Sequence, residues 1–391
     1  MQRLAFREVT IDGFRGIKQL ELEKLGPLNL LVGENNSGKT SVLEALSVLC
    51  NRYEPYEWLS MIRRRDFGGL DETRVQSLRW CFNQSGDLVD PDFMFEGCCN
   101  FSCKGEYAVT SLKAEYRDIV GEPGERELER IARYRNRTGE FADLEAQWRG
   151  AELTHHIVND GSFREIELSD PPAGPITVQF WEEDRMLGRA GRSRRRWNIP
   201  TETLTPYSYQ LNRLQVSSHS NQLLLPFIDE IVNSKQAVLD LIQEFDPDIS
   251  DIVIASLRGG RPAIYLKHKR LGPAPLSVFG DALRRAVLLA STIQSLKGGV
   301  LLIDEIETGI HVTALKRVFA WLASTAQRYQ VQIFATTHSL EAVDAVSDSV
   351  EDRIDDLATY HINQSREQTT VKRIAGEMLL RLRRERGLDV R

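Results

Sequence analysis

The sequence has little of what marks several specialised classes of protein. Its uncharged stretches are short: residues 286–296 form one of the longest, against the roughly 20 apolar residues of a transmembrane helix. Five cysteines in 391 residues are few, and odd in number, for a disulfide framework. A net charge of −6 gives no overall attraction for nucleic acid. Because charges already interrupt the first seven positions, no secretory leader is expected, and the sequence predicts a cytoplasmic protein without a membrane partner.

The remaining composition is that of an ordinary globular protein. Hydrophobic residues make up 41% and charged residues 27%, which excludes collagen-like, disordered and coiled-coil-dominated chains. One domain per about 150 residues predicts two or three structural units. Cys98, Cys99 and Cys103 are close together in the sequence, but no second pair of ligands lies at zinc-site spacing. We therefore expect buried or half-buried thiols there.

Apolar periodicity predicts strands and helices along most of the chain. Two strands are expected around the turn Gly13-Phe14-Arg15-Gly16, followed by a buried strand at 28–32. The polar segment 51–175 is predicted to be strand-rich with one charged helix at 125–137. The later elements are expected in this order: strand 176–181, helix 221–245, a turn at Asp246-Pro247-Asp248, hairpin strands 252–257 and 262–267, helix 281–296, strand 300–303, helix 312–329, strand 332–336, a helix, a strand and a packed terminal helix within 372–391.

A glycine-rich loop between the strand at 28–32 and an amphipathic helix predicts nucleotide binding. Residues 33–40 read Gly-Glu-Asn-Asn-Ser-Gly-Lys-Thr and match G-x-x-x-x-G-K-[ST]. In this pattern backbone N–H groups and the helix N-terminus hold phosphates, the lysine reaches the β- and γ-phosphates, and the hydroxyl binds Mg²⁺. A plain strand-to-helix turn is the alternative. The residues expected to bind ATP are Gly33, Asn35, Asn36, Ser37, Gly38, Lys39, Thr40 and Ser41, with Thr40 also a ligand of Mg²⁺.

The second half of the candidate site follows the apolar strand at 300–303. That strand ends in Asp304 and Glu305, and an acid at the carboxyl end of a strand faces the ligand crevice of an open α/β sheet. Asp304 is therefore expected to hold Mg²⁺, and Glu305 to orient or deprotonate the attacking water. Many strands end in an acid, so this pattern indicates a nucleotide site only in combination with the phosphate loop.

The order of these motifs resembles a known family. The phosphate loop is followed by Ser-x-x-Gly-Asp at 277–281, by Asp304-Glu305 and by Thr337-His338-Ser339, and the chain resembles the ABC-type ATPases of the SMC/RecF/OLD group. The resemblance implies an α/β fold, an ABC-type ATPase head with a mixed sheet around the phosphate loop, two lobes and an inserted helical arm. The expected boundaries are 1–185 for the first lobe with its strand-rich insertion, 186–250 for the arm and 251–391 for the second lobe.

The resemblance also implies roles for residues outside the two core motifs. Arg15 would contact the nucleotide near its phosphates. Ser277 and Gly280 would form the signature motif, which caps the γ-phosphate bound to a second subunit. His338 would act beside the catalytic glutamate as the switch histidine that senses this phosphate.

Some of these positions have a structural alternative. Ser277 can be a helix cap, and His338 can be an ordinary polar residue at the end of a strand. His311 is expected to be structural rather than catalytic. The chain departs from the family at Ala282, where glycine is more usual, and at Ile310, where leucine is.

The function implied by the resemblance is control of another protein. About 50 residues follow His338, too few for the Toprim nuclease domain of OLD-type proteins, and the long heptad arms of SMC proteins are missing. Compact ATPases of this layout are similar to the sensor subunits of bacterial anti-phage systems, such as the ATPase subunit of the PARIS system with its separate Toprim-type nuclease. The expectation is therefore a slow ATPase that forms a head-to-tail homo-oligomer through shared ATP sites, responds to a phage-protein trigger and controls an effector nuclease.

Two other functions are compatible with the same motifs. One is a RecF-like DNA-binding repair ATPase, which would need several phosphate contacts. The other is a nucleotide-dependent scaffold with little turnover. The arginines within 189–196 could meet DNA phosphates or an acidic partner, or form a solvated loop.

Overall fold

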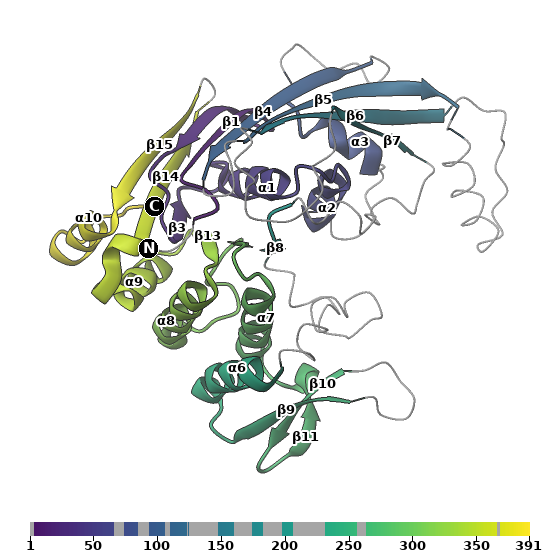
Figure 1. Ribbon diagram of the computed structural model, residues 1–391. Helices are drawn as coiled ribbons and strands as arrows, with labels where there is room; N and C mark the ends of the chain where they lie inside the picture. Colours follow the sequence, from purple (N-terminus) through teal and green to yellow (C-terminus); the bar gives the residue numbers. More distant parts are fainter. Residues whose placement is uncertain are drawn as a thin grey trace.

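The computed structural model describes residues 4–65, 74–84, 94–105, 110–122, 124, 148–159, 174–182, 198–205, 231–255, 263–365 and 368–391. These residues form a mixed α/β structure with three β-sheets (Figure 1). The predicted helix at 125–137, the arginines within 189–196 and most of the predicted arm at 186–250 lie outside the described residues. Within the described part of the chain, no helix is both long and apolar enough to cross a membrane.

The central sheet carries the phosphate loop. Its strand order is β15-β14-β3-β13-β12-β8, and all neighbours are parallel except the antiparallel pair β14 and β15. Every residue of β3, β12 and β13 is buried, as near-continuous apolar strands require when both faces of a parallel sheet are covered. The bounds are β3 Leu28–Val32, β8 Thr201–Leu204, β12 Val300–Ile303, β13 Gln332–Thr336, β14 Leu357–Gln364 and β15 Thr369–Ala375.

Two hydrophobic cores cover the faces of the central sheet. On one face, α1 (Lys39–Cys50) lies between it and a second sheet, all antiparallel, of order β2-β1-β4-β5-β6-β7. On the other face pack α7, α8 and α9. The second sheet arches over α1, α2 and α3 in Figure 1. The bounds are β1 Glu8–Phe14, β2 Ile17–Leu22, β4 Glu96–Lys104, β5 Thr110–Gly121, β6 Trp148–Asn159, β7 Ile176–Trp181, α2 Tyr56–Arg65, α3 Arg74–Arg79, α7 Asp281–Ser295, α8 Val312–Tyr329 and α9 Leu340–Ser349.

A small third sheet packs against α6 and α7 through its own core. It consists of β9 (Ile249–Ala255), β10 (Ala263–His268) and β11 (Gly272–Pro275), and α6 spans Ile231–Phe245. The predicted hairpin is confirmed by the antiparallel pairing of β9 and β10. The predicted helix at 221–245 is confirmed from residue 231 onward, and its first ten residues lie outside the described ones.

Two predictions are wrong in part. The segment 51–175, predicted to be strand-rich with one helix at 125–137, also contains the helices α2 and α3. The terminal helix expected within 372–391 is limited to α10 (Gly376–Leu380) and a π-helical turn over Arg381–Glu385. Residues 369–375 form β15 instead, an edge strand antiparallel to β14. The run Thr369-Thr370-Val371 is β-branched and so fits a strand, and the charges that follow suit an exposed edge.

The expectation for the clustered cysteines holds for Cys99 and Cys103, which are buried, but not for Cys98. All five are free, and only Cys98 is exposed. Burial raises the pKa of Cys81 to about 12 and that of Cys99 well above the ordinary value. Among the described residues, no group suited to a metal ion includes a cysteine. The four buried thiols therefore belong to the hydrophobic core beneath the second sheet.

A buried histidine joins α2 to the second sheet. The indole N–H of Trp58 donates to His155 Nε2 (2.9 Å), and the other ring nitrogen lies 2.8 Å from the carbonyl oxygen of Arg52. The side chains of Trp58 and His155 are fully buried. Because Trp58 uses the Nε2 lone pair, the ring carries its proton on Nδ1 and donates it to the carbonyl.

Removing this histidine is predicted to destabilise the fold. His155→Leu takes one hydrogen bond from each of two buried groups, at about 1–3 kcal/mol for each group left without its partner, so we expect a loss of roughly 2–5 kcal/mol. Urea unfolding followed by tryptophan fluorescence measures this change. The matched control is His156→Leu on the exposed face of the same strand, where only a surface pair with Glu115 is lost and the expected change is below about 1 kcal/mol. Equal effects of the two variants would contradict the prediction.

Candidate nucleotide-binding site

The candidate site lies where three neighbouring parallel strands end. Strands β12, β13 and β3 are adjacent and parallel, so the segments that leave their carboxyl ends meet at one edge of the sheet. A cavity of about 320 Å³ opens there. Its lining consists of Asn35, Asn36, Ser37, Gly38, Lys39, Thr40, Ser41, Arg65, Asp304, Glu305, Thr336, Thr337 and His338.

The backbone of the phosphate loop has the shape that its glycines permit. Gly33 and Gly38 have φ of +149° and +94°, values that favour residues without a side chain. A Cβ on Gly33 would lie 2.3 Å from the carbonyl oxygen of Ile362. Helix α1 begins at Lys39 without a side-chain cap, so its first N–H groups remain available to an anion, as in phosphate-binding helix starts.

Lys39 lies folded over its own loop. Its ammonium donates to the carbonyl oxygens of Gly33 and Glu34, each at 2.7 Å. Burial lowers the pKa of Lys39, and the nearby carboxylates of Asp304, Glu305 and Glu307 oppose this shift. The ammonium thus lies among several acids, positioned to reach phosphate oxygens.

Asp304 and Thr40 offer the oxygen ligands that Mg²⁺ prefers. The hydroxyl of Thr40 donates to the Asp304 carboxylate at 3.2 Å, across 264 positions of sequence. The hydroxyl of Thr336 donates to the same carboxylate at 2.6 Å. Burial raises the pKa of Asp304, and these two hydrogen bonds oppose the shift. A hydroxyl next to a largely desolvated carboxylate fits a hard divalent cation that bridges to phosphates.

Glu305 is held in a costly backbone conformation. Its φ is +49°, which costs a non-glycine residue about 1–2 kcal/mol and recurs at functional positions. Its N–H donates to the Thr336 hydroxyl at 2.9 Å, and its carboxylate accepts from the Thr308 hydroxyl at 2.9 Å. The buried Arg285 of α7 donates to its carbonyl oxygen at 2.8 Å. The carboxylate is therefore fixed at the cavity wall, where a base for water would stand.

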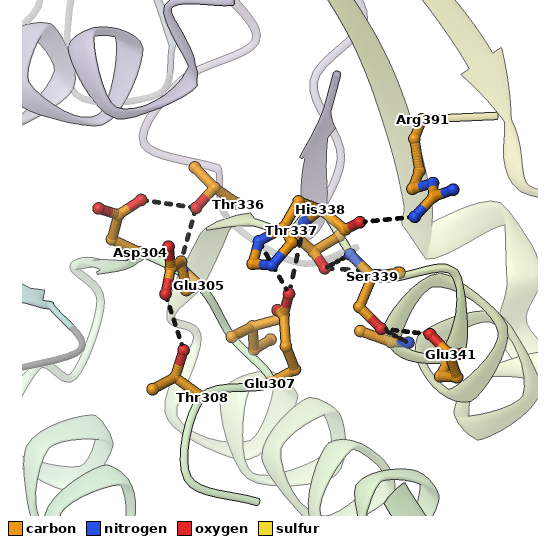
Figure 2. Close-up of polar contacts among 12 residues, drawn as sticks. Asp304, Glu305, Glu307, Thr308, Thr336, Thr337, His338, Ser339, Glu341 and Arg391 are labelled. Carbon is orange, nitrogen blue, oxygen red and sulfur yellow. Dashed lines mark hydrogen bonds and ion pairs between the residues drawn. The ribbon is translucent and has the colours of Figure 1, made fainter. Parts of the chain in front are cut away.

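His338 follows β13 and completes the cavity wall (Figure 2). Its side chain is 52% exposed, and Nδ1 lies 3.4 Å from Oε1 of Glu307. The cavity thus brings together the phosphate loop, Asp304, Glu305 and His338, as the sequence predicts.

Other predicted residues lie outside the cavity. Arg15 forms an ion pair with the buried Glu44 of α1 at 2.7 Å and is not among the lining residues. Ser277 lies in a short 3₁₀ turn (Leu276–Val278), and Gly280 is the N-cap of α7. Ser277 is therefore not the cap of that helix. His311 caps α8 through its ring nitrogen, which accepts from the Thr313 N–H at 3.4 Å, as a structural residue does.

Arg65 is a cavity residue that the sequence analysis missed. It ends α2, pairs with Glu44 at 2.6 Å and donates to the Ser41 hydroxyl at 3.3 Å. Its guanidinium adds positive charge beside the phosphate loop. The only sequence signal is the run Arg63-Arg64-Arg65, which carries no indication of the partner in α1.

A second acidic group in the structure is not a metal site. Asp246, Asp248 and His268 gather within 4.8 Å, at the turn predicted for 246–248. However, His268 Nδ1 accepts from the N–H groups of Arg270 and Leu271, and its other nitrogen faces Asp246 at 3.3 Å. The Nδ1 lone pair is used and Nε2 carries the proton. These contacts link Asp246 and the turn after His268 to the end of β10 in the small sheet.

Two family models match the sequence. One, described as "AAA ATPase domain", matches residues 6–121. The other, described as "AAA domain, putative AbiEii toxin, Type IV TA system", matches residues 131–344, more than half of the chain. The chain belongs to this AAA-domain family. This membership and the site geometry identify an ATPase of the AAA-domain type.

A solved SMC head shares the fold of this chain. The fold of this chain is similar to that of an SMC head whose crystal structure was determined bound to the C-winged helix domain of ScpA. The TM-score is 0.50 and the sequence identity is 11%, and the match covers 95% of this chain and 97% of that one. The head likeness confirms the expected fold. An SMC head from Thermotoga maritima matches with a TM-score of 0.43, 12% identity and coverage of 95% and 99%.

The curated relatives cover less of the AAA-domain chain. Two uncharacterized proteins of Methanocaldococcus jannaschii, MJECL10 and MJECL11, are 41% identical over 56 residues and 37% identical over 65 residues. These matches cover 14% and 17% of this chain. The chain spans 26% of the length of the first and 57% of the second.

Proposed function

We propose that this chain binds ATP with Mg²⁺ in the cavity at the end of β3 and hydrolyses it slowly within an assembly of two or more copies. We further propose that the nucleotide state controls a separate effector nuclease in defence against phage. The proposal rests on one observation: some of the motif residues lie in the cavity and the others lie outside it. Lys39, Thr40, Asp304, Glu305 and His338 share one cavity, whereas Ser277 and Gly280 lie outside it.

Each cavity residue has a role that its position supports. Lys39 binds the β- and γ-phosphates, while Thr40 and Asp304 hold Mg²⁺. The metal, when bound, neutralises charge on the phosphates. Glu305 orients the attacking water and accepts its proton, and His338 contacts the γ-phosphate.

The signature residues favour a site shared between copies. Ser277 and Gly280 flank Val278, whose side chain is 64% exposed, and a second exposed valine, Val312, begins α8 at 53%. In a head-to-tail pair, the signature segment of one copy would cap the γ-phosphate bound by the other and complete the site.

The proposed effector has support from the comparisons. The family description refers to a toxin–antitoxin system, in which two components act on each other, and this favours an ATPase that works through a partner. The similar SMC head binds a winged-helix domain, so heads of this fold can hold a second protein. These observations are compatible with a Toprim-type nuclease as partner, as in a PARIS-like system.

The mass of the purified protein with and without ATP·Mg²⁺ tests the shared site. We expect ATP to convert monomers into dimers or multiples of them, and Lys39→Ala to remain monomeric. Coexpression with a nuclease encoded beside this gene should give a complex whose mass changes with ATP. A monomer under every nucleotide condition would refute the shared site, and salt-sensitive DNA binding by that monomer would favour a RecF-like repair ATPase.

Mixing two inactive variants gives a sharper test. Lys39→Ala lacks the phosphate ligand and Ser277→Arg lacks the cap, so each is expected to hydrolyse little ATP alone. A mixed dimer has one complete site of two, built from Lys39 of one copy and Ser277 of the other, so the mixture is expected to regain ATP turnover that neither variant shows alone. A mixture as inactive as its components would show that Ser277 does not act on the neighbouring site.

A further inference from the structure

The loop after β12 places a second glutamate against the predicted switch histidine. Oε1 of Glu307 lies 3.4 Å from the backbone N–H nitrogen of His338 and 3.4 Å from its ring Nδ1 (Figure 2). The Glu307 side chain is 14% exposed. Its other oxygen, Oε2, is buried and has no hydrogen-bond partner among the described residues.

This placement has an energetic cost that calls for an explanation. A buried carboxylate oxygen without a partner costs about 1–3 kcal/mol, and buried polar groups are otherwise satisfied with few exceptions. Among the described residues, Glu307 accepts a hydrogen bond from the backbone N–H of His338, and the His338 ring is the side chain within ion-pair distance of it. Glu307 is also close enough to Lys39 to oppose the lowering of the Lys39 pKa by burial. The carboxylate therefore belongs to the nucleotide site.

The same histidine is held from the other side by a distant part of the chain. The guanidinium of Arg391 donates to the carbonyl oxygen of His338 at 3.2 Å (Figure 2). The segment that carries it is fastened at several points. Val390 is buried, His361 Nε2 lies 2.9 Å from the carbonyl oxygen of Arg391, and Arg383 donates to the carbonyl oxygen of Leu388 at 2.7 Å.

We propose that Glu307 and Arg391 are positioning residues that together hold His338 toward the nucleotide. Glu307 directs the Nδ1 proton toward itself, which leaves Nε2 as the ring nitrogen for the γ-phosphate. Arg391 fixes the peptide of the same residue. This inference rests on the proposed ATPase function and adds how its switch histidine is oriented.

The physical reason is the freedom of a half-exposed ring. An imidazole in water exchanges between two tautomers and rotates about its side-chain bonds, whereas one nitrogen held by a carboxylate fixes both the tautomer and the ring direction. Hydrogen bonds to charged groups are also stronger than neutral ones. Glutamine at 307 could accept from a protonated Nδ1 through its oxygen or donate to an unprotonated Nδ1 through its NH₂ group, so it would lose the selection of one tautomer.

The direct test is the tautomer of His338 in the full chain. With ¹⁵N-labelled histidine, we expect the neutral ring of His338 to carry its proton on Nδ1 in the wild type and to become a mixture in Glu307→Gln. Assignment follows from the peak lost in His338→Gln. A wild-type ring protonated on Nε2 would overturn the proposal without reference to any variant.

Steady-state kinetics give the second measurement. Positioning groups of this kind typically contribute 10–100-fold, so we expect kcat to fall about tenfold or more in Glu307→Gln and Arg391→Ala, with KM for ATP changed less than about threefold. Arg391→Lys should recover most of the loss because it keeps a donor. The matched control is Glu341→Gln, whose carboxylate accepts from the neighbouring Ser339 hydroxyl instead of the ring.

The outcomes separate the inference from the proposed function. A wild-type chain without ATP turnover in any assembly would refute the ATPase proposal, while the tautomer would still decide whether Glu307 orients the ring. Normal turnover in both Glu307→Gln and Arg391→Ala, with an unchanged tautomer, would refute the positioning role and leave the ATPase intact.

Discussion

Replacing Glu305 by glutamine is expected to lower kcat for ATP by about 10²–10⁴-fold, the usual contribution of a general base. The amide is isosteric and keeps the oxygen that accepts from Thr308, so the loop geometry should persist. It cannot accept the proton of the attacking water. Phosphate release under saturating ATP measures the loss, and ATP binding is expected to stay within a few-fold of wild type.

A second expected effect distinguishes the loss of the catalytic base in Glu305→Gln from general damage to the fold. Because bound ATP is no longer consumed, the ATP-dependent assembly of Glu305→Gln should persist longer than that of the wild type. Glu341→Gln, an exposed carboxylate near the same loop, is expected to leave both the rate and the assembly unchanged. An unchanged rate in Glu305→Gln would favour the scaffold with little turnover.

Replacing Lys39 by alanine is expected to weaken ATP binding by about 10–100-fold, since a hydrogen bond to a charged group contributes roughly 1.5–3 kcal/mol. Burial lowers the pKa of this lysine in the protein, which means that its charge is partly desolvated. Its removal should therefore cost the nucleotide-free fold little. Titration calorimetry with ATP·Mg²⁺ measures the affinity.

The specificity of the lysine effect needs its own control. Lys297→Ala removes an exposed ammonium between α7 and β12 and is expected to bind ATP as the wild type does. Thermal unfolding without nucleotide should be similar in both variants. ATP affinity in Lys39→Ala within twofold of wild type would contradict the assignment of this loop to phosphate binding.

Three strands of the central sheet and half of the site are readable from the sequence because their signals are local, whereas β8 and β15 were not predicted. Strands 28–32, 300–303 and 332–336 coincide with β3, β12 and β13, since burial on both faces leaves uninterrupted apolar runs. The phosphate loop and the Asp304-Glu305 pair follow two of these strands directly. Adjacent parallel strands bring their carboxyl ends together, so the cavity follows from the strand order.

The rest of the site depends on contacts that no short pattern encodes. Arg65 reaches the cavity through Glu44, 21 positions earlier. Glu307 meets His338 across 31 positions, and Arg391 meets it across 53. Strand β15 was hidden by its basic residues, which an exposed edge tolerates as well as a helix does. Contacts between residues so far apart in the sequence are determined by how the elements pack, and this packing can be seen only in the folded structure.

The position of β3 has a consequence for how the chain acquires its structure. This strand is bordered by β13 and β14. Its backbone groups on both edges can therefore pair only with segments that lie some 300 residues further along the chain. Contacts of such long sequence separation slow folding, and an apolar strand with open edges is prone to aggregate meanwhile. During synthesis the phosphate loop leaves the ribosome long before residue 338. Nucleotide is therefore expected to stabilise the chain only at the end of its folding, when the last wall of the cavity has formed.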